Sequence, residues 1–181
     1  MKGIVMTLLE RMVVEEAGLE LWQSMLDETG LPGVYTAGGL YDDEEVFALV
    51  NSLSNKTAVA TELVLCKFGR YMMTPFRELY PMFFDEGMGF FDFLLSVDSV
   101  IHLEVKKLYP DAQLPSFSFE LVEGGKQLKV RYESNRQLCD LAIGLMEESA
   151  NVFNVVCTIT HGPHCLKNGD DHCDLSVLSN G

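Results

Sequence analysis

The spacing of apolar residues predicts helices along the first half of the chain. Val5, Leu8, Leu9 and Met12 recur at the intervals that place side chains on one face of a helix. The Thr29–Gly33 segment, with two glycines and a proline, interrupts this pattern. We therefore expect helices over residues 2–17, 18–27, 42–54, 57–71, 76–84 and 89–97, and a longer helix over 92–109.

The pattern changes after Tyr109-Pro110, because proline disfavours helix at the residue before it. Apolar side chains alternate over 116–122, and a glycine pair lies within the turn signal Glu123–Lys126. Helices followed by strands predict an α+β fold with an antiparallel sheet. The remaining expected elements are a return strand over 128–134, a helix over 135–151, and two closing strands over 152–161 and 173–178.

Composition limits the classes of partner. A chain of 181 residues with 48% hydrophobic residues suits one globular domain. Its net charge of -14 argues against nucleic acid and anionic membrane surfaces, and permits a partner with a basic patch. No apolar run reaches the length of a membrane span, and the first residues do not resemble a signal peptide. We therefore expect a cytoplasmic protein without membrane insertion.

His102 lies in an apolar stretch of the predicted 92–109 helix, between Ile101 and Leu103. A histidine in such a place is either a structural core residue or a neutral ligand for a metal or heme iron. Its position alone leaves both readings open.

Three polar side chains with strand spacing stand at the end of the return strand. Tyr132, Ser134 and Arg136 alternate, so a strand would point them to the same side. A phenol, a hydroxyl and a guanidinium in a row suit carboxylates such as the two propionates of heme. The alternative is an exposed strand end with ordinary polar residues.

The order and spacing of several motifs resemble the heme–nitric oxide/oxygen-binding (H-NOX) family, whose fold also forms the heme domain of soluble guanylate cyclase. The likeness runs from residue 1 to about residue 150, so it covers most of the chain. Its motifs are Met1-Lys2-Gly3, Gly18, Trp22, the Val97–His102 segment, Pro115 and the YxSxR signature Tyr132–Arg136.

The resemblance implies one domain, 1–181, which binds heme b noncovalently. A helical N-terminal part of about residues 1–60 and a proximal part of about residues 61–181 would enclose the heme. His102 would be the iron ligand, and Tyr132, Ser134 and Arg136 would bind the propionates. Pro115 would press on the porphyrin, although a proline before a strand is also common in loops.

The resemblance also bears on the gas. Oxygen-binding relatives carry a distal tyrosine five residues after the arginine of YxSxR, and Leu141 stands there in this chain. Since bound oxygen needs a hydrogen-bond donor more than nitric oxide or carbon monoxide does, we expect a preference for nitric oxide. The other distal positions implied by the same matching are also apolar: Val5, Leu9, Phe76 and Leu145.

A second group of candidate ligands lies near the C-terminus. Cys165 and Cys173 fall close to His161 along the chain, and Cys139 follows the signature motif. Zinc prefers four nitrogen and sulfur ligands, so a structural zinc site is expected, as in a subset of bacterial relatives. Alternatives are His164 or His172 as a ligand, and a polar loop that binds metal only adventitiously.

We therefore expect a nitric oxide sensor rather than an enzyme. In this family the output is a separate protein, typically a histidine kinase or a cyclic-di-GMP enzyme, switched through loss of the bond between His102 and iron. Competing readings are a heme enzyme, a zinc hydrolase and a gas carrier, and a zinc or thiol redox sensor is a possible added role. The sequence contains no HExxH motif of a zinc hydrolase.

Overall fold

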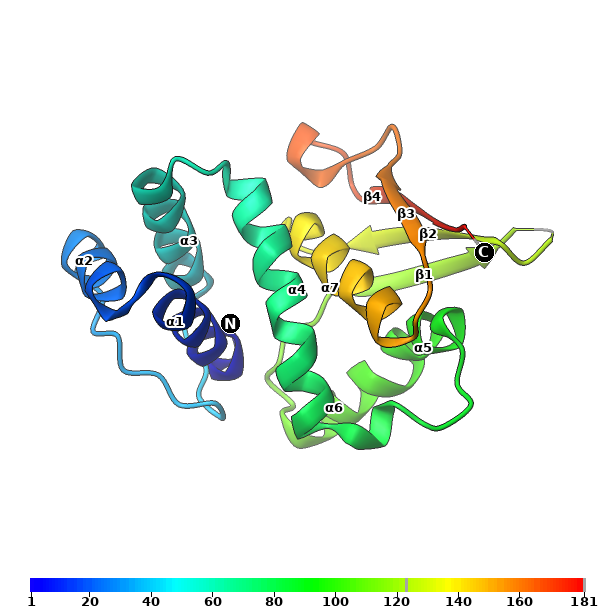
Figure 1. The fold of residues 1–181 in the computed structure, drawn as a ribbon, viewed down its shortest axis with the longest axis horizontal. Coiled ribbons are helices and arrows are strands. Elements are labelled where there is room, and N and C mark those ends of the chain that lie inside the picture. Colours follow the sequence, from blue (N-terminus) through cyan, green and yellow to red (C-terminus); the bar gives the residue numbers. More distant parts are fainter. Residues whose placement is uncertain (123, 181) are drawn as a thin grey trace.

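The computed structural model describes residues 1–122 and 124–180. Three helices pack together at one side of the molecule, and a long fourth helix lies between them and a sheet (Figure 1). These helices are α1 (Gly3–Ala17), α2 (Leu19–Thr29), α3 (Asp43–Thr57) and α4 (Thr61–Leu79). The expected α+β fold, with helices first and an antiparallel sheet later, is confirmed.

The N-terminal helices bury one face each, as their apolar spacing predicts. Met6, Leu9 and Met12 of α1 are buried in a core that includes Trp22 of α2 and Leu49 of α3. None of the described helices is both long and apolar enough to cross a bilayer.

Helix α4 joins segments that the sequence predicts as two separate helices, over 57–71 and 76–84. It continues through Pro75 as far as Leu79, and only residues 81–83 form a separate 3-10 turn. The proline removes one backbone hydrogen bond. The buried residues Phe68 and Met72 before it and the partly buried Phe76 after it keep one apolar face packed on the N-terminal core.

The predicted helix over 92–109 is not regular. It consists of α5 (Phe90–Ser96), a π-helical turn (Val97–Ile101) and α6 (His102–Leu108). The backbone N–H of His102 bonds to the carbonyl of Val97, five residues earlier. A π turn inserts one extra residue into a helix, and such turns are frequent at functional sites. The π turn directly before His102 therefore marks this histidine as a candidate functional residue.

The sheet has four strands in the order β1-β2-β4-β3, all antiparallel. The predicted hairpin between the first two strands is present, since Val122 N–H bonds to the Gln127 carbonyl at 2.9 Å. Glu123, which belongs to the predicted turn, lies outside the described residues. The strands are β1 (Ser116–Leu121), β2 (Gln127–Glu133), β3 (Cys157–His161) and β4 (Cys173–Ser179).

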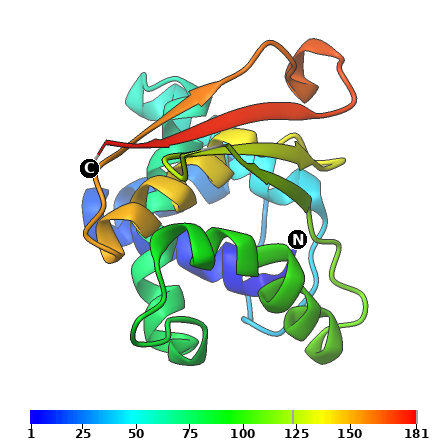
Figure 2. The same cartoon turned by 90° about the vertical axis from the view of Figure 1, so that its right-hand side faces the viewer.

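Helix α7 (Cys139–Val152) covers one face of the sheet and packs on α4 (Figures 1 and 2). Two glycines allow this close approach. A Cβ atom on Gly69 of α4 would lie 2.2 Å from the Leu141 carbonyl oxygen, and one on Gly144 of α7 would lie 1.9 Å from the Cys66 carbonyl oxygen. The two helices therefore form one wall between the N-terminal core and the core beneath the sheet.

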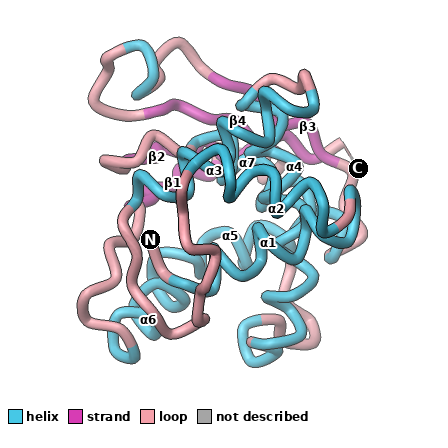
Figure 3. The backbone as a smooth tube through the Cα atoms, turned by 90° about the vertical axis from the view of Figure 1, so that its left-hand side faces the viewer, coloured by secondary structure: helices cyan, strands magenta, loops and turns pink. Residues whose placement is uncertain are grey.

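The tube in Figure 3 shows the N-terminal helices in front of the sheet, with the start of the chain near the loop that leads into β1. That arrangement brings the first residues of the chain to the same region as the loop before β1.

Candidate functional site

A cavity of about 270 Å³ lies between the two cores. Residues of α1, α4, the His102 helix, the loop before β1, both strands of the hairpin, and α7 contribute to its walls, which are mainly apolar. Nine of the ten heme-site residues expected from the sequence line it: Val5, Phe76, His102, Pro115, Tyr132, Ser134, Arg136, Leu141 and Leu145.

Leu9 is the exception. Its side chain is fully buried in the N-terminal helical core, and it is absent from the described lining of the cavity. Leu9 therefore packs α1, the helix that also carries Val5, into the N-terminal core and does not form part of the described cavity surface.

His102 reaches the cavity from the first residue of α6. Its Nδ1 atom lies 3.3 Å from Oδ1 of Asp98, one turn earlier, and its ring is 5.8 Å from that of Phe117. Burial lowers the pKa of His102, and the hydrogen bond and negative charge of Asp98 partly oppose this shift. A largely buried imidazole with one nitrogen on a carboxylate has the other available as a metal ligand.

The YxSxR residues meet at the cavity, but a strand does not carry all three. Strand β2 ends at Glu133, and the segment after it turns. The Ser134 hydroxyl accepts the backbone N–H of Arg136 at 3.1 Å, and Gln137 has a positive φ of 54°. A hydroxyl that bonds a backbone N–H two residues later stabilises a turn instead of a strand. The predicted helix accordingly starts at Cys139, not at residue 135.

Tyr132 is the buried member of this row, with 2% of its surface exposed, and burial raises the pKa of its phenol to about 12. The phenol is thus a neutral donor at physiological pH. Arg136 is held at its other side by Asp43, with Nε 2.7 Å from Oδ2, and its Nη1 donates to the Gln113 carbonyl. The sequence offered no signal for Asp43, which lies far from Arg136 along the chain.

The cavity wall near α4 and α7 is apolar, and it includes three methionines that the sequence motifs did not predict. Met72, Met73 and Met146 line the cavity. The one hydroxyl on the α7 part of the described lining belongs to Ser149, which donates to the Leu145 carbonyl at 2.6 Å. Its proton is therefore engaged by the helix backbone.

These residues fit an iron porphyrin. The cavity has apolar walls for the ring, an imidazole for the iron, and a phenol, a hydroxyl and a guanidinium for two carboxylates. The Nε atom of Arg136 is buried and has no well-aligned hydrogen bond, although Asp43 lies near it. Since Nε faces Asp43 and Nη1 donates to the Gln113 carbonyl, the Nη2 protons and one Nη1 proton of this guanidinium remain for an anionic ligand.

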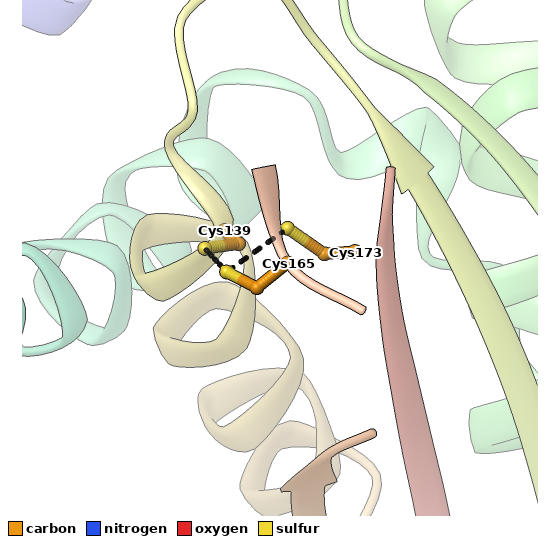
Figure 4. A group of neighbouring side chains, drawn as sticks. All are labelled: Cys139, Cys165 and Cys173. Carbon is orange, nitrogen blue, oxygen red and sulfur yellow. Dashed lines mark hydrogen bonds between the residues drawn. The ribbon is translucent and has the colours of Figure 1, made fainter. Parts of the chain in front are cut away.

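The three cysteines expected to bind metal lie together, below the end of the sheet. Figure 4 shows their side chains pointing toward one another from the start of α7, a loop and β4. The Sγ atom of Cys165 is 3.9 Å from that of Cys139 and 3.6 Å from that of Cys173. Tetrahedral thiolates about 2.3 Å from zinc lie about 3.8 Å apart, so the spacing suits this metal.

Among the described residues, His161 shares a candidate ligand group with one of these cysteines, Cys139, but does not join the group of three cysteines. Its ring forms a group with Cys139 and Asp140 whose ligand atoms lie within 4.8 Å of one another. His161 Nε2 also lies 3.8 Å from Oδ1 of Asp140. For their part, His164 and His172 contact other acidic residues, as in the 3.1 Å contact of His172 Nε2 with Asp174. Among the described residues neither joins a candidate ligand group with the cysteines.

Comparisons with known proteins agree with this geometry. Residues 2–161 match the family model Haem-NO-binding. An H-NOX protein from S. oneidensis in the Fe(II)NO ligation state matches with a TM-score of 0.93 and 30% identity over 100% of each chain. The Fe(II) unliganded H-NOX protein from K. algicida matches with a TM-score of 0.91 and 28% identity, over 100% of this chain and 97% of the other.

The fold and the cavity therefore define a heme-based gas-sensor domain. The chain belongs to the Haem-NO-binding family and is an H-NOX domain. Members of this family bind heme and, through it, nitric oxide, carbon monoxide or oxygen; a second S. oneidensis structure is in the Fe(II)CO ligation state.

Proposed function

We propose that this H-NOX domain is a cytoplasmic nitric oxide sensor, without enzymatic activity of its own, that regulates a separate signalling protein. The observation that carries the proposal is the placement of His102 and the Tyr132, Ser134 and Arg136 row around one apolar cavity. His102 is the proposed iron ligand, and the row is the proposed propionate site.

A bound heme would supply the iron that takes the gas, and His102 would hold that iron through a bond that nitric oxide would weaken. His102 is fixed in its helix and bonded to Asp98, whereas Arg136 follows β2 and contacts α3 through Asp43. Release of His102 would remove a restraint between these two parts. The N-terminal helices could then shift against the sheet, provided that the two states bind the gas with different affinities.

Pro115 supports this mechanism from the loop before β1. It lines the same cavity as His102 and Phe117, where its rigid ring could press on a bound porphyrin. We propose that this contact holds the unliganded state and is relieved when His102 is released.

The cavity wall near Leu141 explains the proposed choice of gas. Val5, Phe76, Leu141 and Leu145 present no hydrogen-bond donor, and the nearby Ser149 hydroxyl is already bonded to the backbone. An apolar wall gives bound oxygen no hydrogen bond, so nitric oxide and carbon monoxide are favoured.

The proposed partner is a histidine kinase or a cyclic-di-GMP enzyme. The net charge of -14 suits a partner with a basic surface and opposes nucleic acid. Within the described cavity lining, no acid and base lie side by side as an enzyme would require. A heme enzyme and a gas carrier are the competing functions.

A second proposed role concerns the cysteine cluster. We propose that Cys139, Cys165 and Cys173, with His161 as the fourth ligand, hold a structural zinc that ties the start of α7 to β4. The spacing of the sulfur atoms supports it. Zinc thiolates can be oxidised, which allows an added redox response.

The absorption spectrum of the ferrous protein under argon, air, carbon monoxide and nitric oxide tests the main proposal. Nitric oxide and carbon monoxide should change the Soret band, and air should not. A protein that binds no heme after expression with a heme precursor is not such a sensor, and turnover of an added substrate would indicate an enzyme. The regulatory step is tested by kinase or cyclic-di-GMP enzyme activity with and without the gas-loaded protein.

A further inference from the structure

Asp43 and Arg136 form a contact between the N-terminal helices and the segment after the hairpin. Asp43 begins α3, and Arg136 lies three residues beyond the end of β2. The two are 2.7 Å apart, from Oδ2 to Nε. Only 11% of the Arg136 side chain is exposed, against 32% for Asp43.

The guanidinium of Arg136 is held on two sides. Nε faces Asp43, and Nη1 donates to the Gln113 carbonyl. A guanidinium has five N–H donors, so the Nη2 edge and one Nη1 proton remain for another acceptor. Because Arg136 lines the cavity, these donors are available to an anion bound there.

Asp43 is itself attached to the first residues of the chain. The Met1 nitrogen lies 2.7 Å from Asp43 Oδ1, Tyr41 N–H donates to the Met1 carbonyl at 2.9 Å, and Lys2 pairs with Leu40 in an isolated β bridge. Met1 and Lys2 also line the cavity. The position of Asp43 therefore follows the position of the N-terminal helices.

The contact is an ion pair with an imperfect hydrogen bond. Despite the 2.7 Å separation, Arg136 Nε has no well-aligned acceptor. Attraction between the charges restrains the guanidinium without fully satisfying it. Such a restraint leaves room for the guanidinium to adjust when a further carboxylate approaches.

We propose that Asp43 is a positioning residue, which holds Arg136 with its remaining donors toward the cavity and links the N-terminal helices to the carboxylates bound by Arg136. This inference rests on the proposed heme function. An arginine that is already ordered loses less conformational entropy when it binds a carboxylate. A shift of that carboxylate would move Arg136, and through Asp43 it would move α3.

The test compares Asp43→Asn with Asp42→Asn in the heme-loaded full chain. Asp42 is its exposed neighbour, makes no side-chain cap, and serves as the charge-matched control. Transfer of heme to an excess of a heme-scavenging apoprotein should be about two- to tenfold faster in Asp43→Asn, the cost of ordering one flexible side chain. Backbone amides of residues 36–43 should exchange faster with solvent, whereas Asp42→Asn should match the unmodified protein in both measurements.

A double variant separates positioning from general destabilisation. Arg136→Lys removes the guanidinium that contacts Asp43 and the Gln113 carbonyl. If Asp43 acts only by positioning that guanidinium, adding Asp43→Asn to Arg136→Lys should accelerate heme loss no further. Additive effects, or equal behaviour of Asp43→Asn and Asp42→Asn, would overturn the proposal. If the unmodified chain binds no heme, the proposed function fails separately. The exchange measurement still decides whether Asp43 restrains this segment.

Discussion

Asp98 Oδ1 lies 3.3 Å from both His102 Nδ1 and the backbone nitrogen of Phe117. One carboxylate oxygen therefore connects the helix that carries the proposed iron ligand with the first strand of the sheet. In the tautomer that donates from Nδ1 to Asp98, Nε2 of His102 is the free ligand atom. Partners of this kind orient the ring and raise its basicity.

The first prediction concerns this contact. Asp98→Asn is expected to retain heme but to weaken the bond between His102 and iron. The substitution replaces a negatively charged carboxylate by a neutral amide, so the imidazole becomes less basic. Heme loss should be about tenfold faster, the smaller of the effects found when a metal-binding histidine loses its hydrogen-bond partner. The iron–histidine stretching frequency in the resonance Raman spectrum should fall. Glu104→Gln, which changes a half-exposed carboxylate on the same helix that pairs with Lys107, should leave the frequency unaltered.

His102→Gly should abolish normal heme binding. The other three histidines, His161, His164 and His172, are absent from the described lining of the cavity. Added imidazole should restore a ferrous spectrum close to that of the unmodified protein. His164→Gly, which removes an exposed ring, is the control. Unchanged heme content in His102→Gly without imidazole would show that His102 is not the ligand.

Local sequence patterns predicted most of the fold. Apolar spacing located the N-terminal helices, and the glycine pair located the hairpin. The π turn before His102 was not predicted, since the 3.6-residue pattern continues across a single inserted residue. The continuation of α4 through Pro75 was also missed, because tertiary packing on both sides outweighs the lost hydrogen bond.

The site was predictable where its residues are close in sequence or belong to a known motif. The YxSxR residues do line the cavity, although by a turn at Ser134 and not by strand alternation. Asp98 could have been found from its four-residue spacing to His102. Asp43 and Gln113 could not, because only the tertiary fold brings them to Arg136.

The ferrous protein is expected not to bind oxygen in air. Leu141→Tyr would place a phenol on the apolar wall, and a hydrogen bond to a charged acceptor is worth about 1.5–3 kcal/mol. Oxygen affinity should therefore rise by about ten- to a hundredfold, as measured by titration of the absorption spectrum. Leu141→Phe adds similar volume without the hydroxyl and should give no such increase. A stable oxygen complex of the unmodified protein would contradict the role given to Leu141.

Metal analysis should find about one zinc per chain after purification in reducing buffer. Replacing Cys139, Cys165 or Cys173 by serine should release it and lower the melting temperature by about 5 °C or more, as expected for loss of at least about 2 kcal/mol. Cys157→Ser is the matched control, because Cys157 is outside the cluster. His161→Ala should weaken zinc binding more than His164→Ala, and the opposite order would assign the fourth ligand to the other histidine.

The last prediction tests how binding reaches the partner. Pro115 lies in the loop that joins the His102 helix to β1, and it lines the cavity beside His102 and Phe117. Pro115→Ala removes the rigid ring, so a bound porphyrin should become flatter, as measured by its out-of-plane modes in the resonance Raman spectrum. The N-terminal helices should then adopt part of the shift that nitric oxide produces.

Activity of the regulated protein should change in step with this shift of the N-terminal helices. Without gas, Pro115→Ala should move partner activity part of the way toward the nitric oxide-bound level, and imidazole-loaded His102→Gly should move it further, because its porphyrin is no longer bonded to the helix. Pro110→Ala changes another proline of the same loop, one outside the described cavity lining, and controls for loop flexibility. If both variants keep the partner at its unliganded level while binding heme normally, release of His102 is not the signal, and the heme assignment stands without this mechanism.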